Sequence, residues 1–262
     1  QYYKRWIRSF SRETIEVKIS NNKSSNNWEG IGPWDFDINA ESRSYAPGAA
    51  HLYTVEQSKS NNNVLYAGAA TAGAWRSNNK GDNWFHITKD FHLSSVYALE
   101  IDFQDEDIIY ISGNGGLHKS IDGGTNWNSV GGSNFNSQSH SIKDIKMHPQ
   151  NNQIIFIASD KGLYKSTDGG ILLIEIMSGD FQEIEFHPSS SDTMYFIKQD
   201  ANFTEFYRSN DNGDNLTLFT NGWPAPSAND EQKRTEIAVS IAAPNKIVAL
   251  ATGSANGGSG LY

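Results

Sequence analysis

The sequence predicts an all-β fold, a portion of a β-propeller built from four-stranded antiparallel blades, and two observations carry this prediction. First, a short phrase recurs four times, with Ser, then Asp or Asn two residues later, then Gly two residues after that. Its serines, Ser77, Ser120, Ser166 and Ser209, lie 43 to 46 residues apart, and a period of roughly 40 to 45 residues is typical of propeller blades. Second, short alternating strands precede every copy, as a four-stranded blade requires.

The four copies differ in detail but keep their register. They read "SNNKGDNW" (77–84), "SIDGGTNW" (120–127), "STDGGILL" (166–173) and "SNDNGDNL" (209–216), and each follows a short strand such as "GLHKS" or "GLYKS". The last three residues, "GLY" (260–262), repeat the start of that strand and stop before a serine. We therefore expect residues 50–262 to form four complete blades and part of a truncated fifth, in a fragment that continues past Tyr262.

Two further strands are expected upstream of each phrase. In "SIKDIKMHPQNNQIIFIAS" (141–159) and "FQEIEFHPSSSDTMYFIK" (181–198), an alternating strand ends at His-Pro and a β-branched or aromatic strand follows. The fourth strand is expected to begin at the tryptophan of the phrase, as in "WNSV" (127–130). His148 and His187 occupy equivalent turns before proline, so we expect them to pack in those turns rather than to bind metal.

This pattern resembles the Asp-box or BNR repeat of sortilin-like propellers, sialidases, xyloglucanases and photosystem-assembly-factor-like proteins, over residues 50–262. In those families the box is a structural hairpin, in which Ser and Asp bond to turn backbone and Gly supplies unusual backbone angles. Leu173 and Leu216 keep the apolar cover in the two copies without tryptophan. The resemblance therefore implies a structural role for Ser77, Asn79, Gly81, Trp84, Ser120, Asp122, Gly124, Trp127, Ser166, Asp168, Gly170, Ser209, Asp211 and Gly213.

The composition limits the classes of partner and cofactor that we expect this chain to bind. The formal net charge of -9 argues against a nucleic-acid partner, because phosphate binding needs a basic face. Zero cysteines exclude a disulfide framework and thiolate zinc sites. No stretch approaches the ~20 apolar residues of a membrane-spanning helix. "SNDNGDN" lacks the ligand spacing and distal glutamate of an EF-hand, so neither a metal nor a cofactor is expected.

Enzyme signatures are weak, and no catalytic residue is assigned. Arg76 and Arg208 are repeat positions, and Arg5, Arg8 and Arg12 lie outside the repeats, so only Arg43 and Arg234 remain, which is too few for the arginine triad of sialidases. Xyloglucanases of this repeat class carry a catalytic Asp in a phrase similar to "YAGAATAGAWR" (66–76), where Ala70 occupies the corresponding position. Glycoside hydrolysis needs two carboxylates at a defined separation. Enzymatic activity is therefore uncertain, and the sequence favours a protein without it. A catalytic pair of carboxylates elsewhere in the fold is the open alternative.

Ligand contacts are expected on the face that carries the loops between second and third strands and between blades. That face holds the longest loops, "GGSNFNSQSH" (131–140) and "TNGWPAPSANDEQKRTE" (220–236), and loops on a rigid scaffold are the usual place for function. Trp223, Phe135 and Phe203 are the candidate binding residues, because an aromatic side chain there could stack on a sugar or fill a pocket of a partner.

Residues 1–49 do not follow the period and form a separate lead-in segment. "NNWEGIGPWDFD" (26–37) resembles the lead-in to the first blade of large bacterial surface proteins exported by the type IX system. The leading expectation is an exported, non-enzymatic module, secreted or at the cell surface, that binds a protein or glycan as part of a longer chain or larger assembly. The alternatives are a glycoside hydrolase with catalytic carboxylates partly in missing blades, and an assembly factor for a membrane protein complex.

Overall fold

The computed structural model describes residues 52–113, 116–132, 140–200, 203–223, 232–253 and 260–261. Contacts divide the chain into two units, residues 1–49 and 50–262, and every described residue belongs to the second. In this described part the regular structure is all β-strand, without a helix, so none could span a membrane as a helix. The second unit is a β-propeller portion of antiparallel blades.

Five sheets follow one another along the chain, four with four strands and the fifth with three described strands, and we name them blades 1 to 5. Within each blade consecutive strands pair in antiparallel order. The strands of blades 1 and 2 are β1 (Leu52–Gln57), β2 (Leu65–Ala69), β3 (Ala74–Ser77), β4 (Phe85–His86), β5 (Leu99–Ile101), β6 (Ile109–Gly113), β7 (Gly116–Ser120) and β8 (Asn128–Val130). Those of blades 3 to 5 are β9 (Ile142–His148), β10 (Asn151–Ser159), β11 (Gly162–Ser166), β12 (Ile174–Ser178), β13 (Asp180–His187), β14 (Ser190–Gln199), β15 (Thr204–Ser209), β16 (Thr217–Phe219), β17 (Gln232–Ser240), β18 (Ala243–Gly253) and β19 (Gly260–Leu261).

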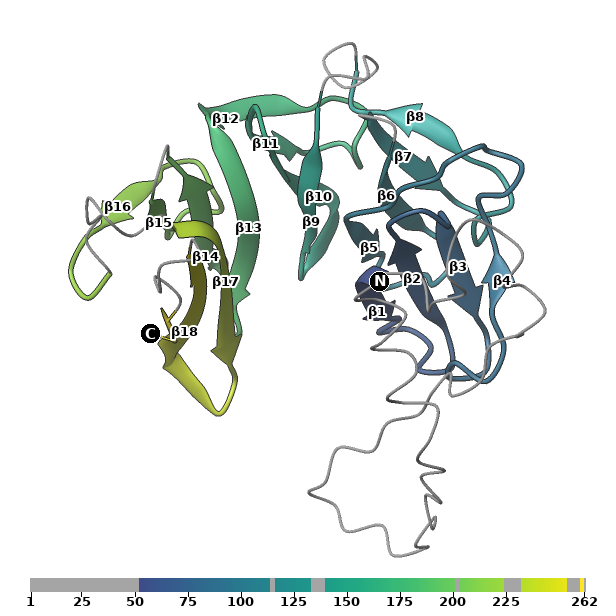
Figure 1. The fold of residues 1–262 in the computed structure, drawn as a ribbon, viewed down its shortest axis with the longest axis horizontal. Helices are drawn as coiled ribbons and strands as arrows, with labels where there is room; N and C mark the ends of the chain where they lie inside the picture. The colour runs from purple at the N-terminus through teal and green to yellow at the C-terminus, as the bar shows by residue number, and fades with distance from the viewer. Residues whose placement is uncertain are drawn as a thin grey trace, which may run out of the picture. The chain divides into compact units, whose positions relative to one another are not determined.

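Neighbouring blades contact one another mainly through their first strands. β1 lies against β5, β5 against β9, β9 against β13, and β13 against β17. These strands lie toward the inner side in Figure 1, while the fourth strands β4, β8, β12 and β16 lie on the outside. The fourth strand of blade 2 begins at Asn128, one residue after the tryptophan at which it was expected.

The hydrophobic core lies between blades rather than within one blade. In blades 1 to 4 the second strand places a large aromatic ring toward the next blade, and these equivalent rings are all at least 95% buried. Tyr66 packs with residues of blade 2, for example, and Phe156 with residues of blade 4. Burying such a side chain stabilises the fold by roughly 1.5–3 kcal/mol. The rings at this position are Tyr66, Tyr110, Phe156 and Tyr195.

The recurring phrase forms a tight turn between the third and fourth strands, which we call the repeat turn. In blade 2, Ser120 Oγ accepts a hydrogen bond from the Gly124 amide at 2.9 Å and donates to Asp122 Oδ1 at 2.8 Å. The Asp122 carboxylate also accepts the Asn126 amide at 2.8 Å. Gly124 has a φ of 90°, a left-handed conformation that favours glycine. The other three repeat turns make the same serine and side-chain bonds.

The repeat turn binds the hairpin between the first and second strands of its own blade. The Gly123 amide donates to the Asp107 carbonyl, and the Gly169 amide to the Gln153 carbonyl, both at 2.9 Å. These two loops therefore share one face of the propeller, and the loops between blades share the other. His148 supports its hairpin by accepting the Gln150 amide at 3.2 Å, so the histidine packs in the turn as expected.

In blades 1 to 3 a cation on the third strand connects the blade to the next one. Lys119 lies over the Tyr110 ring, 4.9 Å from its centroid, and donates to the Gly169 carbonyl of the following repeat turn at 3.2 Å. Arg76 and Lys165 occupy the same position in blades 1 and 3. These residues serve the joints between blades, which explains why a cation recurs directly before each serine.

Candidate functional site

A cavity of about 290 Å³ lies where the first strands of the blades begin, and we call it the axial pocket. Five blades contribute to it. Its lining comes from β1, from Tyr97 just before β5, from the start of β9, from β13 and from β17. It lies at the ends of the first strands that are far from the repeat turns, on the face of the loops between blades. The lining residues are Tyr53, Tyr97, Ser141, Ile142, Lys143, Gln182 and Arg234.

Two tyrosines from neighbouring blades form the aromatic part of the axial pocket. The ring centroids of Tyr53 and Tyr97 are 4.6 Å apart, with a tilt of 35° between the ring planes. Both side chains are large and apolar, yet 46% and 45% of their surface is exposed. Neither hydroxyl has a hydrogen-bond partner among the residues that the structure describes. The pair can therefore offer ring faces and two hydroxyl groups to a ligand.

The cations of the axial pocket are already paired. Lys143 forms an ion pair with Asp180, and Arg234 forms one with Glu236. The lining itself contains no Asp or Glu. Because each positive charge has a carboxylate beside it, the pocket suits a polar ligand of low net charge better than a polyanion.

Beneath the axial pocket, buried carboxylates bridge the first strands of successive blades. Glu56 accepts the Ile101 amide at 3.1 Å, Asp144 accepts the Ile184 amide at 2.9 Å, and Glu183 accepts the Ile237 amide at 2.7 Å. Each carboxylate satisfies a backbone donor that the first strand would otherwise leave unpaired at its inner edge. Because the same contact recurs at successive joints, these carboxylates have a structural role.

Burial shifts the titration of this carboxylate group. Desolvation raises the pKa of Glu56 to about 7, and that of Asp144 to about 6. Desolvation, followed by repulsion from Glu236, raises the pKa of Glu183 to about 9. Lys146 is the internal counter-charge, with its ammonium 3.7 Å from Glu185, and its pKa is raised chiefly by Asp144. A raised carboxyl pKa also suits a general acid, but the amide contacts explain these groups without catalysis.

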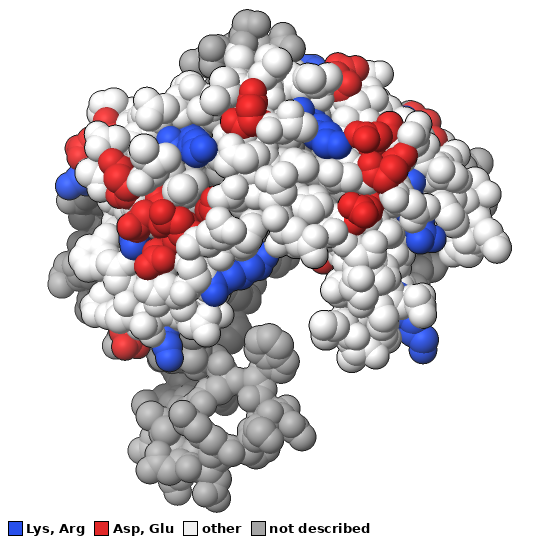
Figure 2. All heavy atoms as spheres, turned by 180° about the vertical axis from the view of Figure 1, so that it is seen from behind, with Lys and Arg blue, Asp and Glu red and all other residues white. Residues whose placement is uncertain are grey.

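The described residues contain no group of three or more His, Asp or Glu side chains that could hold a metal ion. Ala70 lies between β2 and β3, so the position that matches the xyloglucanase aspartate has no carboxylate there. On the face shown in Figure 2, acidic and basic side chains are interspersed, without one continuous basic patch.

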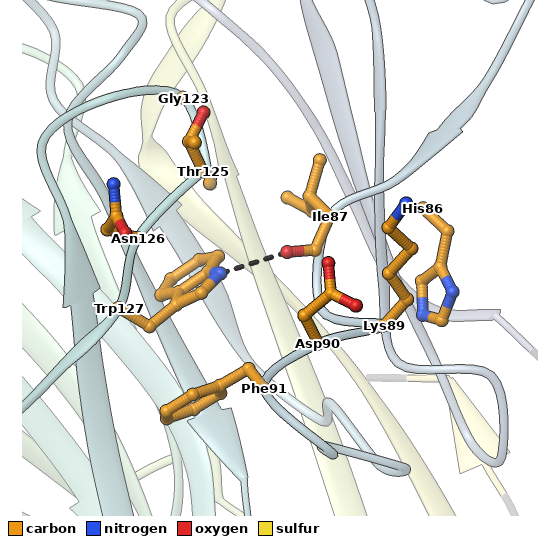
Figure 3. A pocket seen from close by; sticks show the side chains of 10 residues that line it. His86, Ile87, Lys89, Asp90, Phe91, Gly123, Thr125, Asn126 and Trp127 are labelled. Atoms are coloured by element: carbon orange, nitrogen blue, oxygen red, sulfur yellow. Dashed lines mark hydrogen bonds between the residues drawn. The ribbon is translucent and has the colours of Figure 1, made fainter.

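A second cavity, of about 440 Å³, lies at the joint between blades 1 and 2, and we call it the rim pocket (Figure 3). One side runs from His86, the last residue of β4, to Phe91, and the other is the repeat turn of blade 2. The Trp127 indole nitrogen donates to the Ile87 carbonyl at 3.0 Å. Trp127 thus joins the two sides and is held in one orientation.

Two of the aromatic residues predicted from the sequence, Trp223 and Phe203, are not part of the lining of either pocket. Trp223 donates through its indole nitrogen to the Thr204 carbonyl at 2.7 Å and stacks on Phe206, with centroids 5.0 Å apart. Phe203 is half-buried, and its carbonyl accepts the Asp200 amide. Phe135 lies outside the described residues. A ligand-binding role for these three residues stays a prediction.

Sequence reasoning missed Tyr53 and Tyr97. Both stand at the start of an expected first strand, in "HLYTVEQ" (51–57) and "SSVYALE" (94–100). Their place in the repeat could be predicted, because each tyrosine lies a similar number of residues before the serine of its repeat turn. What could not be read was that the two rings meet, because contacts between first strands depend on how the blades pack.

Comparisons with known proteins show the fold and no closer relationship. No family model matches the chain, and no curated protein matches it either. Among solved structures, an ancestral GH74 enzyme matches with a TM-score of 0.61 and 18% identity over 82% of this chain and 31% of that one. The Niastella koreensis GH74 enzyme matches with a TM-score of 0.60 and 21% identity over 82% and 36% of the two chains.

A third similar structure is the GH74 xyloglucanase from Xanthomonas campestris, with a TM-score of 0.60 and 16% identity over 81% of this chain and 34% of that one. This chain thus spans about a third of the length of these enzymes. At such low identity the likeness establishes the β-propeller fold and leaves activity and substrate as matters for proposal.

Proposed function

We propose that this propeller portion is a non-enzymatic binding module, which takes a protein or carbohydrate ligand in the axial pocket on an exported protein at a bacterial surface. The observation that carries the proposal is the exposed Tyr53–Tyr97 pair, at a point where five blades converge. Tyrosine supplies a large contact area and a hydroxyl at a small cost in conformational entropy, which favours it at binding sites.

The polar surroundings support the same function. Lys143 and Gln182 border the tyrosines, and the ion pair of Lys143 with Asp180 keeps local charge balanced. A peptide segment or a glycan offers apolar surface for the rings and polar groups for this border. The surface location rests on the resemblance of residues 26–37 to the lead-in of exported bacterial proteins.

A glycoside hydrolase is the second candidate, favoured by the fold that the chain shares with GH74 enzymes. Ala70 and the absence of carboxylates from the axial pocket lining argue against a complete catalytic pair in the described residues. Release of sugar products by the purified chain would favour this candidate over pure binding. An assembly role would instead be favoured by selective binding to peptides of a membrane complex.

The experiment is to probe glycan and peptide arrays with the labelled chain, and to titrate every hit against Tyr53→Ala and Tyr97→Ala. We expect each substitution to weaken binding by about tenfold or more, since tyrosine contacts at the centre of a site typically carry over 1 kcal/mol. Phe85→Ala is the matched control, because Phe85 is an aromatic residue, 57% exposed, on the outer strand β4. Hits that survive both tyrosine substitutions, or arrays without any hit, would contradict the proposal.

A further inference from the structure

The rim pocket differs from the fully described joint between blades 3 and 4. Its aromatic side is made by Trp127 and Phe91, whose ring centroids are 6.2 Å apart with 27° between the planes. At the joint between blades 3 and 4 the repeat turn has Leu216 instead of tryptophan, and only Gly179 separates β12 from β13. That joint therefore lacks both sides of the pocket, so the rim pocket is not a general product of the repeat.

The two rings are held in place by contacts on their far sides. The Trp127 indole nitrogen is bonded to the Ile87 carbonyl, and the Phe91 ring packs against the edge of His118, with centroids 4.9 Å apart. Both rings are half-buried, so each keeps part of its surface open. A ligand that stacks here meets a preorganised surface and does not have to order it.

Polar groups of mixed charge surround the rings. Lys89 and Asp90 come from the same segment as Phe91, while Thr125 and Asn126 come from the turn that carries Trp127 (Figure 3). All four are exposed. Lys89 and Asp90 form no ion pair or hydrogen bond with the described part of the chain. The side-chain nitrogen of Asn126 donates a hydrogen bond to Asp122, and this bond does not use the side-chain oxygen of Asn126.

The chemistry of this lining selects among ligand classes. A phosphate-bearing ligand would be repelled by Asp90 about as much as it is attracted by Lys89. A lipid tail would leave these charged and polar groups without water or partners. A pyranose ring has a face of C–H bonds that can lie on the electron-rich face of an aromatic ring, and hydroxyl groups around its edge that both donate and accept.

We infer that the rim pocket is a binding site for a neutral pyranose sugar, with Trp127 and Phe91 as the stacking surface and Asp90, Asn126 and Lys89 bonding to ring hydroxyls. The volume of about 440 Å³ is within the range of small-molecule sites and exceeds the needs of a single ring, so a short oligosaccharide fits better than a monosaccharide. This site is separate from the axial pocket and does not depend on the function proposed for it.

The test uses saturation-transfer NMR and tryptophan fluorescence with uncharged probes: β1,4-linked trisaccharides of glucose, mannose and galactose. At least one should bind, and Trp127→Leu should weaken that binding about tenfold or more. Leucine is the residue at this position in blades 3 and 4, so the turn accommodates it. Asp90→Ala, an exposed change, should also weaken binding several-fold while leaving the melting temperature unchanged.

Trp84→Leu is the matched control, since Trp84 is the tryptophan of the repeat turn in blade 1 and does not line the pocket. It should leave affinity within about twofold. The inference is overturned if no trisaccharide binds, if Trp127→Leu retains full affinity, or if Trp84→Leu weakens binding as strongly. Loss of binding in Tyr97→Ala alone would overturn it as well, because the sugar would then occupy the axial pocket.

Discussion

The Lys165 ammonium reaches from blade 3 to blade 4, where it donates to the Asn212 carbonyl at 2.8 Å. The same ammonium lies 5.6 Å from the centroid of the Phe156 ring and 2.7 Å from the Asp214 carboxylate. One side chain therefore joins an aromatic ring of its own blade to the repeat turn of the next. Arg208 occupies the equivalent position in blade 4, but its buried Nε has no hydrogen-bond partner among the described residues.

This difference predicts unequal costs for two similar substitutions. Lys165→Met should lower the free energy of unfolding by roughly 1–2 kcal/mol, because a charged hydrogen bond to the carbonyl of the half-buried Asn212 is lost while the exposed Asp214 contributes little. Arg208→Met should cost less, or even stabilise the chain, because it removes an unsatisfied buried donor. Urea unfolding of the two variants measures both values. Equal losses would contradict the idea that Lys165 acts through the next repeat turn.

A second prediction concerns Asp122 in the repeat turn of blade 2. Asp122→Asn should lower the melting temperature only slightly, because Asn79 accepts the equivalent hydroxyl and backbone amide bonds in blade 1 and only the exposed bond from the Asn126 side chain is lost. Asp122→Ala should lower it, because the Asn126 amide then loses its acceptor. Neither change should selectively abolish ligand binding. An alanine variant with native stability and no binding would instead assign Asp122 to a functional site.

A third prediction separates backbone strain from steric clash at two glycines. Gly81 and Gly124 have φ values of 95° and 90°. A Cβ at Gly81 would have its nearest neighbour at 3.7 Å, so Gly81→Ala should cost only the strain of about 1–2 kcal/mol. A Cβ at Gly124 would lie 2.7 Å from Ile87 Cδ1, so Gly124→Ala should cost more. Thermal unfolding of both variants checks the order, and the reverse order would refute it.

A fourth prediction concerns the pH dependence of stability. The folded-state pKa of Glu183 is raised to about 9, and that of Glu56 to about 7. Since the unfolded chain releases these protons near pH 4.5, their contribution to stability is full below that pH and is lost as the pH rises through the folded-state values. The melting temperature should therefore fall as the pH rises from about 5 to 9.

Glu183→Gln should flatten this decline, because glutamine still offers the Ile237 amide an oxygen and does not ionise. Glu175→Gln, at an exposed position, serves as the control and should leave the slope unchanged. If the melting temperature falls as steeply with pH in Glu183→Gln as in the native chain, the pH dependence of stability comes from other groups.

Features that depend on short separations along the chain could be predicted from the amino-acid sequence. The repeat turn could be predicted because Ser120 bonds to Asp122 and Gly124, residues two and four positions away. The four strands of each blade could be predicted because alternation and turn residues are local signals. The recurring period then predicted four complete blades and part of a fifth within residues 50–262, since each blade repeats one local pattern.

The contacts between side chains of different blades became visible in the folded chain alone. Tyr53 and Tyr97 approach to 4.6 Å because β1 and β5 pack side by side, and Trp127 faces Phe91 because the segment after β4 folds onto the next repeat turn. Such contacts depend on the twist and spacing of whole sheets, which no local pattern encodes. The same packing buries Glu183 beside Ile237, which turns an ordinary carboxyl group into one with a strongly raised pKa.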